Sequence, residues 1–163
     1  MLVSEQLQLR GNKMVSETLK VKGRVNLQLL DKDNNIKETR EYNNLVVAIG
    51  KEYISSRMLA NTDPVMSHMA IGSANVAASL GQTLLLGETS RVALSTPSRS
   101  SNTITYSSTF GAGSGTGTVS EAGIFNSGNT TANTGTMLCR VNFNEVNKAA
   151  SDIIVITWNV TVE

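Results

Sequence analysis

The stretch IIVITWNVTV, residues 153–162, decides the fold. Every second side chain along it is apolar, from Ile154 and Ile156 through Trp158 to Val160 and Val162. Alternation with a period of two is typical of a β-strand that packs one face on a core. The opposite face is also apolar at the start of the stretch, which is typical of a strand with neighbours on both sides. The pattern therefore predicts a central strand with Trp158 in the core.

A second alternation of apolar and polar side chains runs over residues 19–29. The cluster DKDNN at residues 31–35 is typical of a turn, so residues 36–42 are expected to form the return strand of a hairpin. Gly23 takes one of the inward positions of the first strand. A glycine there indicates a bulge or a close crossing by another segment.

Between residues 45 and 59 the apolar side chains are spaced by one, three and four positions, which predicts an α-helix. Asn43 or Asn44 is the candidate N-cap, and the segment ANTDP at residues 60–64 ends the helix. Gly50 is unfavourable inside it. We expect this helix to be the only one in the chain.

The remaining sequence predicts short strands at residues 67–71, 89–95, 103–110, 118–125 and 137–143, separated by turn-rich loops. Val, Ile and Thr make up 41 of the 163 residues, a composition that favours strands. Seven to nine strands and one helix predict a mainly β fold, a jelly-roll-like antiparallel β-sandwich. We assign this single domain to residues 18–163.

Residues 1–17 precede the sandwich and show no hydrophobic period, so we interpret them as an N-terminal arm. Such an arm is either a frayed terminus or a segment that docks on a neighbouring subunit. We expect it to contact another subunit, because leucines at positions 2, 7 and 9 suit small apolar pockets.

The charge balance excludes several classes of partner. Lys and Arg number 14 against 13 Asp and Glu, a formal net charge of +1. Nucleic-acid binding draws on a basic excess that this chain lacks. No stretch has the roughly 18–20 apolar residues that span a bilayer, and the first residues lack the pattern of a secretory signal. We therefore expect no nucleic-acid or membrane partner.

Two motifs that resemble ligand sites have simpler interpretations. The run GAGSGTGT at residues 111–118 is followed by a predicted strand and lacks the lysine of a phosphate-binding loop, so we expect a flexible loop or a long hairpin tip. Asp31, Asp33 and Asn35 have the alternation of a calcium loop, but Glu38 comes too early to close one. We expect a plain hairpin turn there.

Residue types that perform catalysis are scarce. His68 is the single histidine and Cys139 the single cysteine, and both fall on predicted strands, where a packed side chain is the expected state. Glu121 and Asp152 could form the carboxylate pair of a glycosidase only if the fold brought them together. We expect no catalytic, cofactor-binding or metal-ligating residues and no enzymatic activity. Alternation places Arg140 on the face opposite to Cys139, where we expect it to pair with Glu121 across strands.

Four phrases in order resemble those of tailed-bacteriophage virion proteins. They are MSHMAIG at residues 66–72, EAGIFN at 121–126, GTMLCRVNF at 135–143, and KAASD at 148–152 leading into ITW at 156–158. The resemblance covers residues 18–163. It implies a non-enzymatic structural component of a phage particle, located in the virion after assembly in the host cytoplasm.

Within the particle, the small single module favours a capsid decoration, or cement, protein that stabilises the head by non-covalent contacts. Its expected partners are itself, as a homotrimer, and the major capsid protein. The alternative is a tail-fibre, tail-collar or baseplate component with tail proteins as partners. A third hypothesis is a carbohydrate-binding module, which would need exposed aromatic residues.

Overall fold

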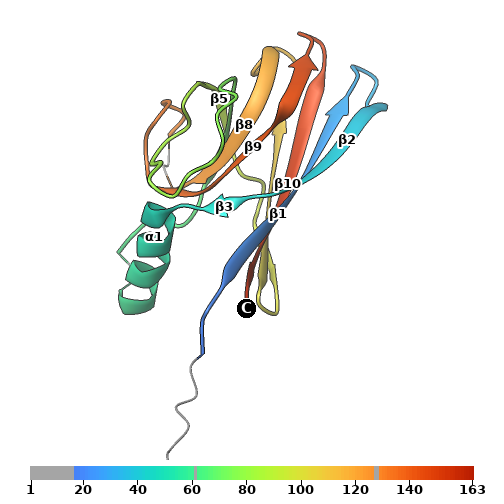
Figure 1. Ribbon diagram of the computed structural model, residues 1–163. Coiled ribbons are helices and arrows are strands. Elements are labelled where there is room, and N and C mark those ends of the chain that lie inside the picture. The colour runs from blue at the N-terminus through green and yellow to red at the C-terminus, as the bar shows by residue number, and fades with distance from the viewer. Residues whose placement is uncertain (1–16, 61, 127–128) are drawn as a thin grey trace, which may run out of the picture.

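Two five-stranded antiparallel sheets face each other, with one helix at their side, in the computed structural model of the chain (Figure 1). It describes residues 17–60, 62–126 and 129–163. The predicted class, a mainly β antiparallel sandwich with one helix, is confirmed. The predicted arm lies outside the described residues except for Glu17.

Each sheet combines strands that lie far apart in the sequence. Sheet A has the order β2 (Ile36–Asn43), β1 (Val21–Leu30), β10 (Ile153–Val162), β7 (Thr103–Phe110) and β6 (Ser98–Ser100). Sheet B has the order β3 (Leu45–Val46), β9 (Met137–Lys148), β8 (Gly117–Phe125), β4 (His68–Gly72) and β5 (Glu88–Ala93). The helix α1 spans Ala48–Leu59.

The stretch that predicts a central strand occupies the middle of sheet A as β10. Trp158 lies opposite Val25 of β1 and Tyr106 of β7 and has no exposed surface. Its indole Nε1 donates to Asn44 Oδ1 at 3.1 Å. The predicted burial of Trp158 is therefore confirmed.

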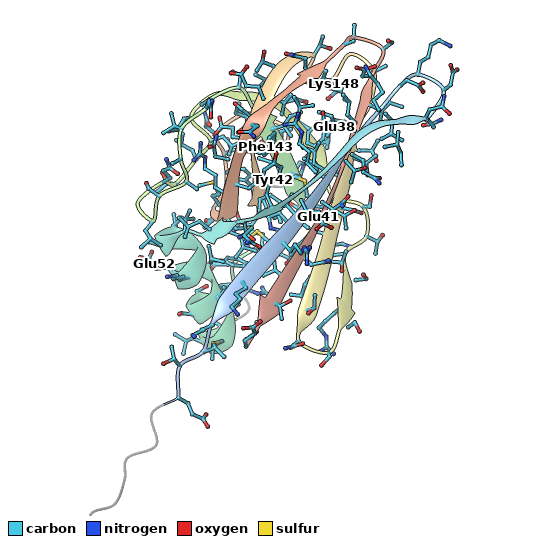
Figure 2. All side chains as sticks on the ribbon, turned by 45° about the vertical axis from the view of Figure 1, so that its right-hand side comes forward. Glu38, Glu41, Tyr42, Glu52, Phe143 and Lys148 are labelled. Atoms are coloured by element: carbon cyan, nitrogen blue, oxygen red, sulfur yellow. The ribbon has the colours of Figure 1, made fainter. Side chains whose placement is uncertain are left out.

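An aromatic contact joins the two sheets at one side of the sandwich. Tyr42 of β2 and Phe143 of β9 bring their ring centroids to 5.5 Å, and Figure 2 labels both. The Arg40 guanidinium, also on β2, donates to the carbonyl of Asn144 at 2.6 Å. These contacts join an edge of sheet A to sheet B.

The predicted hairpin of residues 19–42 is confirmed as β1 and β2. Its turn is built by Asp31, whose carboxylate Oδ1 accepts hydrogen bonds from the backbone N–H groups of Asp33 and Asn35 at 2.8 and 2.9 Å. An aspartate that bonds the backbone two residues on is a common turn device. The aspartates at 31 and 33 thus belong to a plain turn, as expected.

The helix begins later than the sequence predicts. Leu45 and Val46 pair with Arg140 and Cys139 as a short edge strand, and Val47, without a side-chain cap, precedes the first turn. The prediction of a helix from residue 45 with an asparagine cap is wrong, because the sheet edge takes up the first two apolar residues. Asn44 is used elsewhere: it lies where a side chain at Gly23 would be, which confirms the close crossing.

Two further expectations fail in loops. Residues 98–100 form the edge strand β6 although they are polar and exposed. The Gly-rich run leads from β7 in sheet A to β8 in sheet B, so it is a crossover and not a hairpin tip. It is also held in place, because Lys148 Nζ donates to Gly111 O at 2.9 Å and Gly113 N donates to Ala150 O at 2.8 Å. Figure 2 shows Lys148 at that end of the sandwich.

Gly50 sets the distance between α1 and sheet B. A Cβ atom at this position would overlap the backbone carbonyl of Leu138 in β9. We expect Gly50→Ala to lower the free energy of unfolding by about 1–3 kcal/mol, because overpacking outweighs the helix preference of alanine. Urea denaturation measures the effect. Glu52→Ala, on the exposed side of the same helix, is the control and should change stability little; equal effects of the two would contradict this packing.

Candidate functional site

His68 lies in β4, between β5 and β8, with 7% of its surface exposed. Its Nδ1 is 2.9 Å from the Oγ atom of Ser67. A histidine that serves as a general base has to reach a proton of the substrate, and a side chain this enclosed offers little access. The position fits the expected packed histidine.

Cys139 is fully buried in the main core, as the sequence predicts. Burial raises the pKa of its thiol well above the ordinary value, so the reactive thiolate is disfavoured. We expect a thiol reagent such as DTNB to leave the native protein unlabelled at pH 8 and to label one thiol per chain in guanidinium. Rapid stoichiometric labelling of the native protein would show that the core opens there.

Glu121 and Asp152 do not form a catalytic pair, because each is engaged in a different ion pair. Asp152 precedes β10 and accepts from Lys37 Nζ at 2.7 Å and from Ala149 N at 3.0 Å. The bond from Lys37 is the main reason that the pKa of Asp152 lies below its ordinary value. Within the described residues, no three His, Cys, Asp or Glu side chains gather as a metal site.

Glu121 pairs with Arg140 on the outer face of sheet B, which confirms the expected cross-strand pair. Arg140 Nη2 and Nε donate to Glu121 Oε2 at 2.8 and 3.0 Å, and neither side chain has exposed surface. A buried ion pair is tolerated only when its remaining donors and acceptors are also satisfied. The groups that satisfy this pair come from the loop of residues 73–87.

This loop closes over the ion pair as a cover. Gly87 N donates to Glu121 Oε1 at 2.6 Å, and Arg140 Nη1 donates to Gln82 Oε1 at 2.9 Å. Arg140 Nη2 also reaches the carbonyl of Val76 at 2.9 Å. Groups of the chain's own loop thus satisfy both charges, and neither charged side chain is exposed to a ligand. Nothing in the sequence of the loop indicates that it would cover these charges.

A second ion pair fastens the neighbouring segment 129–136. Arg91 binds Glu88 through Nε at 2.8 Å and lies over the ring of Phe125, 4.1 Å from its centroid. Arg91 Nη1 also donates to the carbonyl of Thr134 at 2.7 Å, and the N–H of Asn133 donates to Glu88 at 3.0 Å. Two loops therefore cover the ion pairs on the outer face of sheet B, and the loop of residues 73–87 itself presents apolar side chains to solvent, among them Val76, Leu80 and Leu86.

An open groove of about 560 Å³ lies between α1 and the adjoining end of the sandwich. Figure 1 shows α1 beside this end, close to the start of β1 and to the C-terminus. Side chains from the helix, the loop after it and sheet A line it, among them Tyr53, Ile54, Met58, Val65, Ile104 and Val160. The lining is mostly apolar, so the groove suits an apolar protein segment better than a charged ligand.

The rim of the groove carries large apolar side chains in contact with solvent. Met58 is 77% exposed and Val65 is 62% exposed; Leu59, the last helical residue, does not line the groove but follows Met58 directly and is 91% exposed. Contiguous exposed apolar groups on a polar protein mark an interaction site. The groove is not predicted by the sequence pattern, although the adjacent apolar residues Met58 and Leu59 at the helix end cannot both face the core, which is the one signal that the sequence offers.

By contrast, the outer face of sheet A is polar and nearly uncharged around β7 and β10. Thr103 and Thr161 bring their hydroxyl groups to 2.8 Å, and Thr105 donates to Asn159 Oδ1 at 2.8 Å.

Among the described residues, no helix has the length and apolarity needed to cross a bilayer. No protein-family model, no curated protein and no solved structure matches this chain. The groove is therefore the candidate functional site that its geometry singles out.

Proposed function

We propose that this chain is a non-enzymatic structural component of a tailed-phage particle, and within it a capsid decoration protein. The observation that carries the proposal is the apolar groove with exposed Met58 and Val65, beside a helix end at which Leu59 is also exposed. Such a surface favours burial against protein. A decoration protein works by burying surface between neighbouring subunits, which adds stability to the shell by mass action.

The four phrases that resemble phage virion proteins fall mainly on the scaffold, and among their residues Met66 and Leu138 also line the groove. MSHMAIG contains β4, EAGIFN contributes the end of β8 with Glu121, GTMLCRVNF opens β9 with Arg140, and ITW lies in β10. The resemblance thus concerns the residues that build sheet B, its buried ion pair and the central strand of sheet A. It supports the particle class, while the place in the particle is argued from the size of the module and its groove.

The alternative remains a tail-fibre, tail-collar or baseplate component, which would use the same groove against tail proteins. A carbohydrate-binding module is disfavoured by the aromatic residues. Five of the seven, namely Tyr106, Phe110, Phe125, Phe143 and Trp158, are buried, and Tyr42 and Tyr53 are partly buried. Sugar rings are bound by exposed aromatic faces, which none of these seven presents freely.

The test is to separate heads and tails of the phage that encodes this chain and to locate the chain by mass spectrometry and by a density map of the whole particle. We expect it on the head surface, in contact with the major capsid protein. Heads assembled without it should release their DNA at a lower temperature, and adding purified chain should restore the release temperature. Density in the tail would favour the alternative, and absence from both fractions would contradict the proposal.

A further inference from the structure

We propose that the groove beside α1 receives the N-terminal arm, residues 1–16, of a second copy of this chain. The inference goes beyond the particle role, because it concerns self-association of the purified chain and can fail or hold without it. It rests on the chemistry of the groove, on the sequence of the arm, and on the place at which the described chain begins.

The groove needs an apolar occupant of modest size. Its volume of about 560 Å³ is of the order filled by a few large side chains, and its walls offer Ile54, Met58 and Val160. Met58 and Val65 are largely exposed at its rim, so an apolar segment bound there would bury both side chains. A short segment with apolar residues at intervals would meet these requirements.

The arm has that pattern. In QLQL at residues 6–9, leucines alternate with glutamines, so an extended segment presents Leu7 and Leu9 on one side. The glutamines then face outward, where their amides can bond to backbone or solvent. Sixteen extended residues reach roughly 50 Å, which is ample for a neighbouring molecule.

The described chain begins beside the groove. Lys20 exchanges two backbone hydrogen bonds with Glu163, at 2.6 and 2.7 Å, which extends the β1–β10 ladder beyond Val21. Val21 itself lines the groove, and Leu19 is 64% exposed. Strand pairing with β10 thus fixes the described chain beside the groove, and the cross-link below decides between a groove of the same chain and that of a second copy.

The decisive experiment is a cross-link between two distinguishable chains. A tagged chain with Leu9→Cys is co-expressed with an untagged chain with Met58→Cys, and mild oxidation follows; the native Cys139 is buried and does not compete. We expect a disulfide-linked species that contains one chain of each kind. Gln8→Cys in place of Leu9→Cys, and Ile36→Cys at the far hairpin in place of Met58→Cys, are the matched controls and should link much less.

The same pairing is measured without cross-links by sedimentation equilibrium. Leu7→Glu/Leu9→Glu in the arm and Met58→Glu in the groove should each weaken self-association at least tenfold. Gln6→Glu/Gln8→Glu adds the same charges at the alternate positions of the arm, and Ile36→Glu adds one at a remote exposed position; both should change self-association less than threefold. Deletion of residues 2–13 should abolish association while circular dichroism shows an intact sandwich, because the core that the structure describes is built by residues from Val25 to Val160.

Three outcomes overturn the inference. A chain that stays monomeric at all accessible concentrations has no such contact. A disulfide that forms only within a chain carrying both cysteines would mean that the arm returns to its own groove. Equal effects of the leucine and glutamine variants would mean that the arm associates by some surface other than Leu7 and Leu9.

Discussion

Replacing Trp158 by alanine should lower the free energy of unfolding by about 3–5 kcal/mol, since it removes a large side chain from a packed core. Trp158 has no exposed surface, and Ile154, Ile156 and Val160 on the same face of β10 are buried with it. The substitution also leaves Asn44 Oδ1 without the indole N–H that it accepts. Because this is the only tryptophan of the chain, urea unfolding has to be followed by circular dichroism.

Two further variants test whether the loss of stability comes from removing the tryptophan ring from the core. Trp158→Phe keeps most of the ring volume and should cost less than the alanine variant. Thr157→Ala changes the neighbouring residue on the opposite face of β10 and should cost under about 1 kcal/mol. If Trp158→Ala leaves the unfolding midpoint where it was, the assignment of the core face of β10 is wrong.

Arg140→Met is the second large effect, with an expected loss of about 3–5 kcal/mol, because it leaves the Glu121 carboxylate buried without its cation. The matched control is Arg24→Met, which removes one partner of the pair between Arg24 and Glu41. Their side chains are 68% and 51% exposed, so the control should cost no more than about 1 kcal/mol. Both losses are measured by urea denaturation.

The loop of residues 73–87 offers an independent readout, because Arg140 bonds to Gln82 and Val76 within it. Limited proteolysis should cut this loop faster in Arg140→Met than in the wild type or in Arg24→Met. Adding Glu121→Gln to Arg140→Met removes the stranded charge and should recover part of the lost stability. Equal stability losses for Arg140→Met and Arg24→Met would contradict the role of the buried pair.

Strands whose own sequence alternates were predictable, and elements defined by their neighbours were not. β10 and β1 carry a period of two because one face of each packs on the core, and β2 was expected from the turn that precedes it. Leu45 and Val46 have helical spacing with the residues that follow, yet the open edge of β9 claims them. Ser98–Ser100 has no pattern to detect, since all three side chains are exposed and only pairing with β7 makes a strand.

The same distinction holds for the sites. The pair of Glu121 and Arg140 followed from alternation within single strands, which sets the face of each residue. The cover over it did not, because most contacts of residues 73–87 with the pair use backbone groups, which carry no sequence signal, and Gln82 alone contributes a side chain. The groove lies between a helix, a loop and strand ends far apart in sequence, so only the assembled fold brings its walls together.

The place of β10 in sheet A has a consequence for how the chain folds as it is made. β10 pairs with β1 from Val21↔Val162 to Leu30↔Ile153 and with β7 on its other side, so it joins two hairpins that do not otherwise touch within that sheet. Its residues leave the ribosome after those of every other strand that the structure describes. Sheet B can pair beforehand, whereas sheet A must wait, and contacts so distant in sequence make folding slow. Until β10 is made, β1 and β7 expose unpaired edges that can associate with other nascent chains. Pairing of β10 with both strands removes these edges.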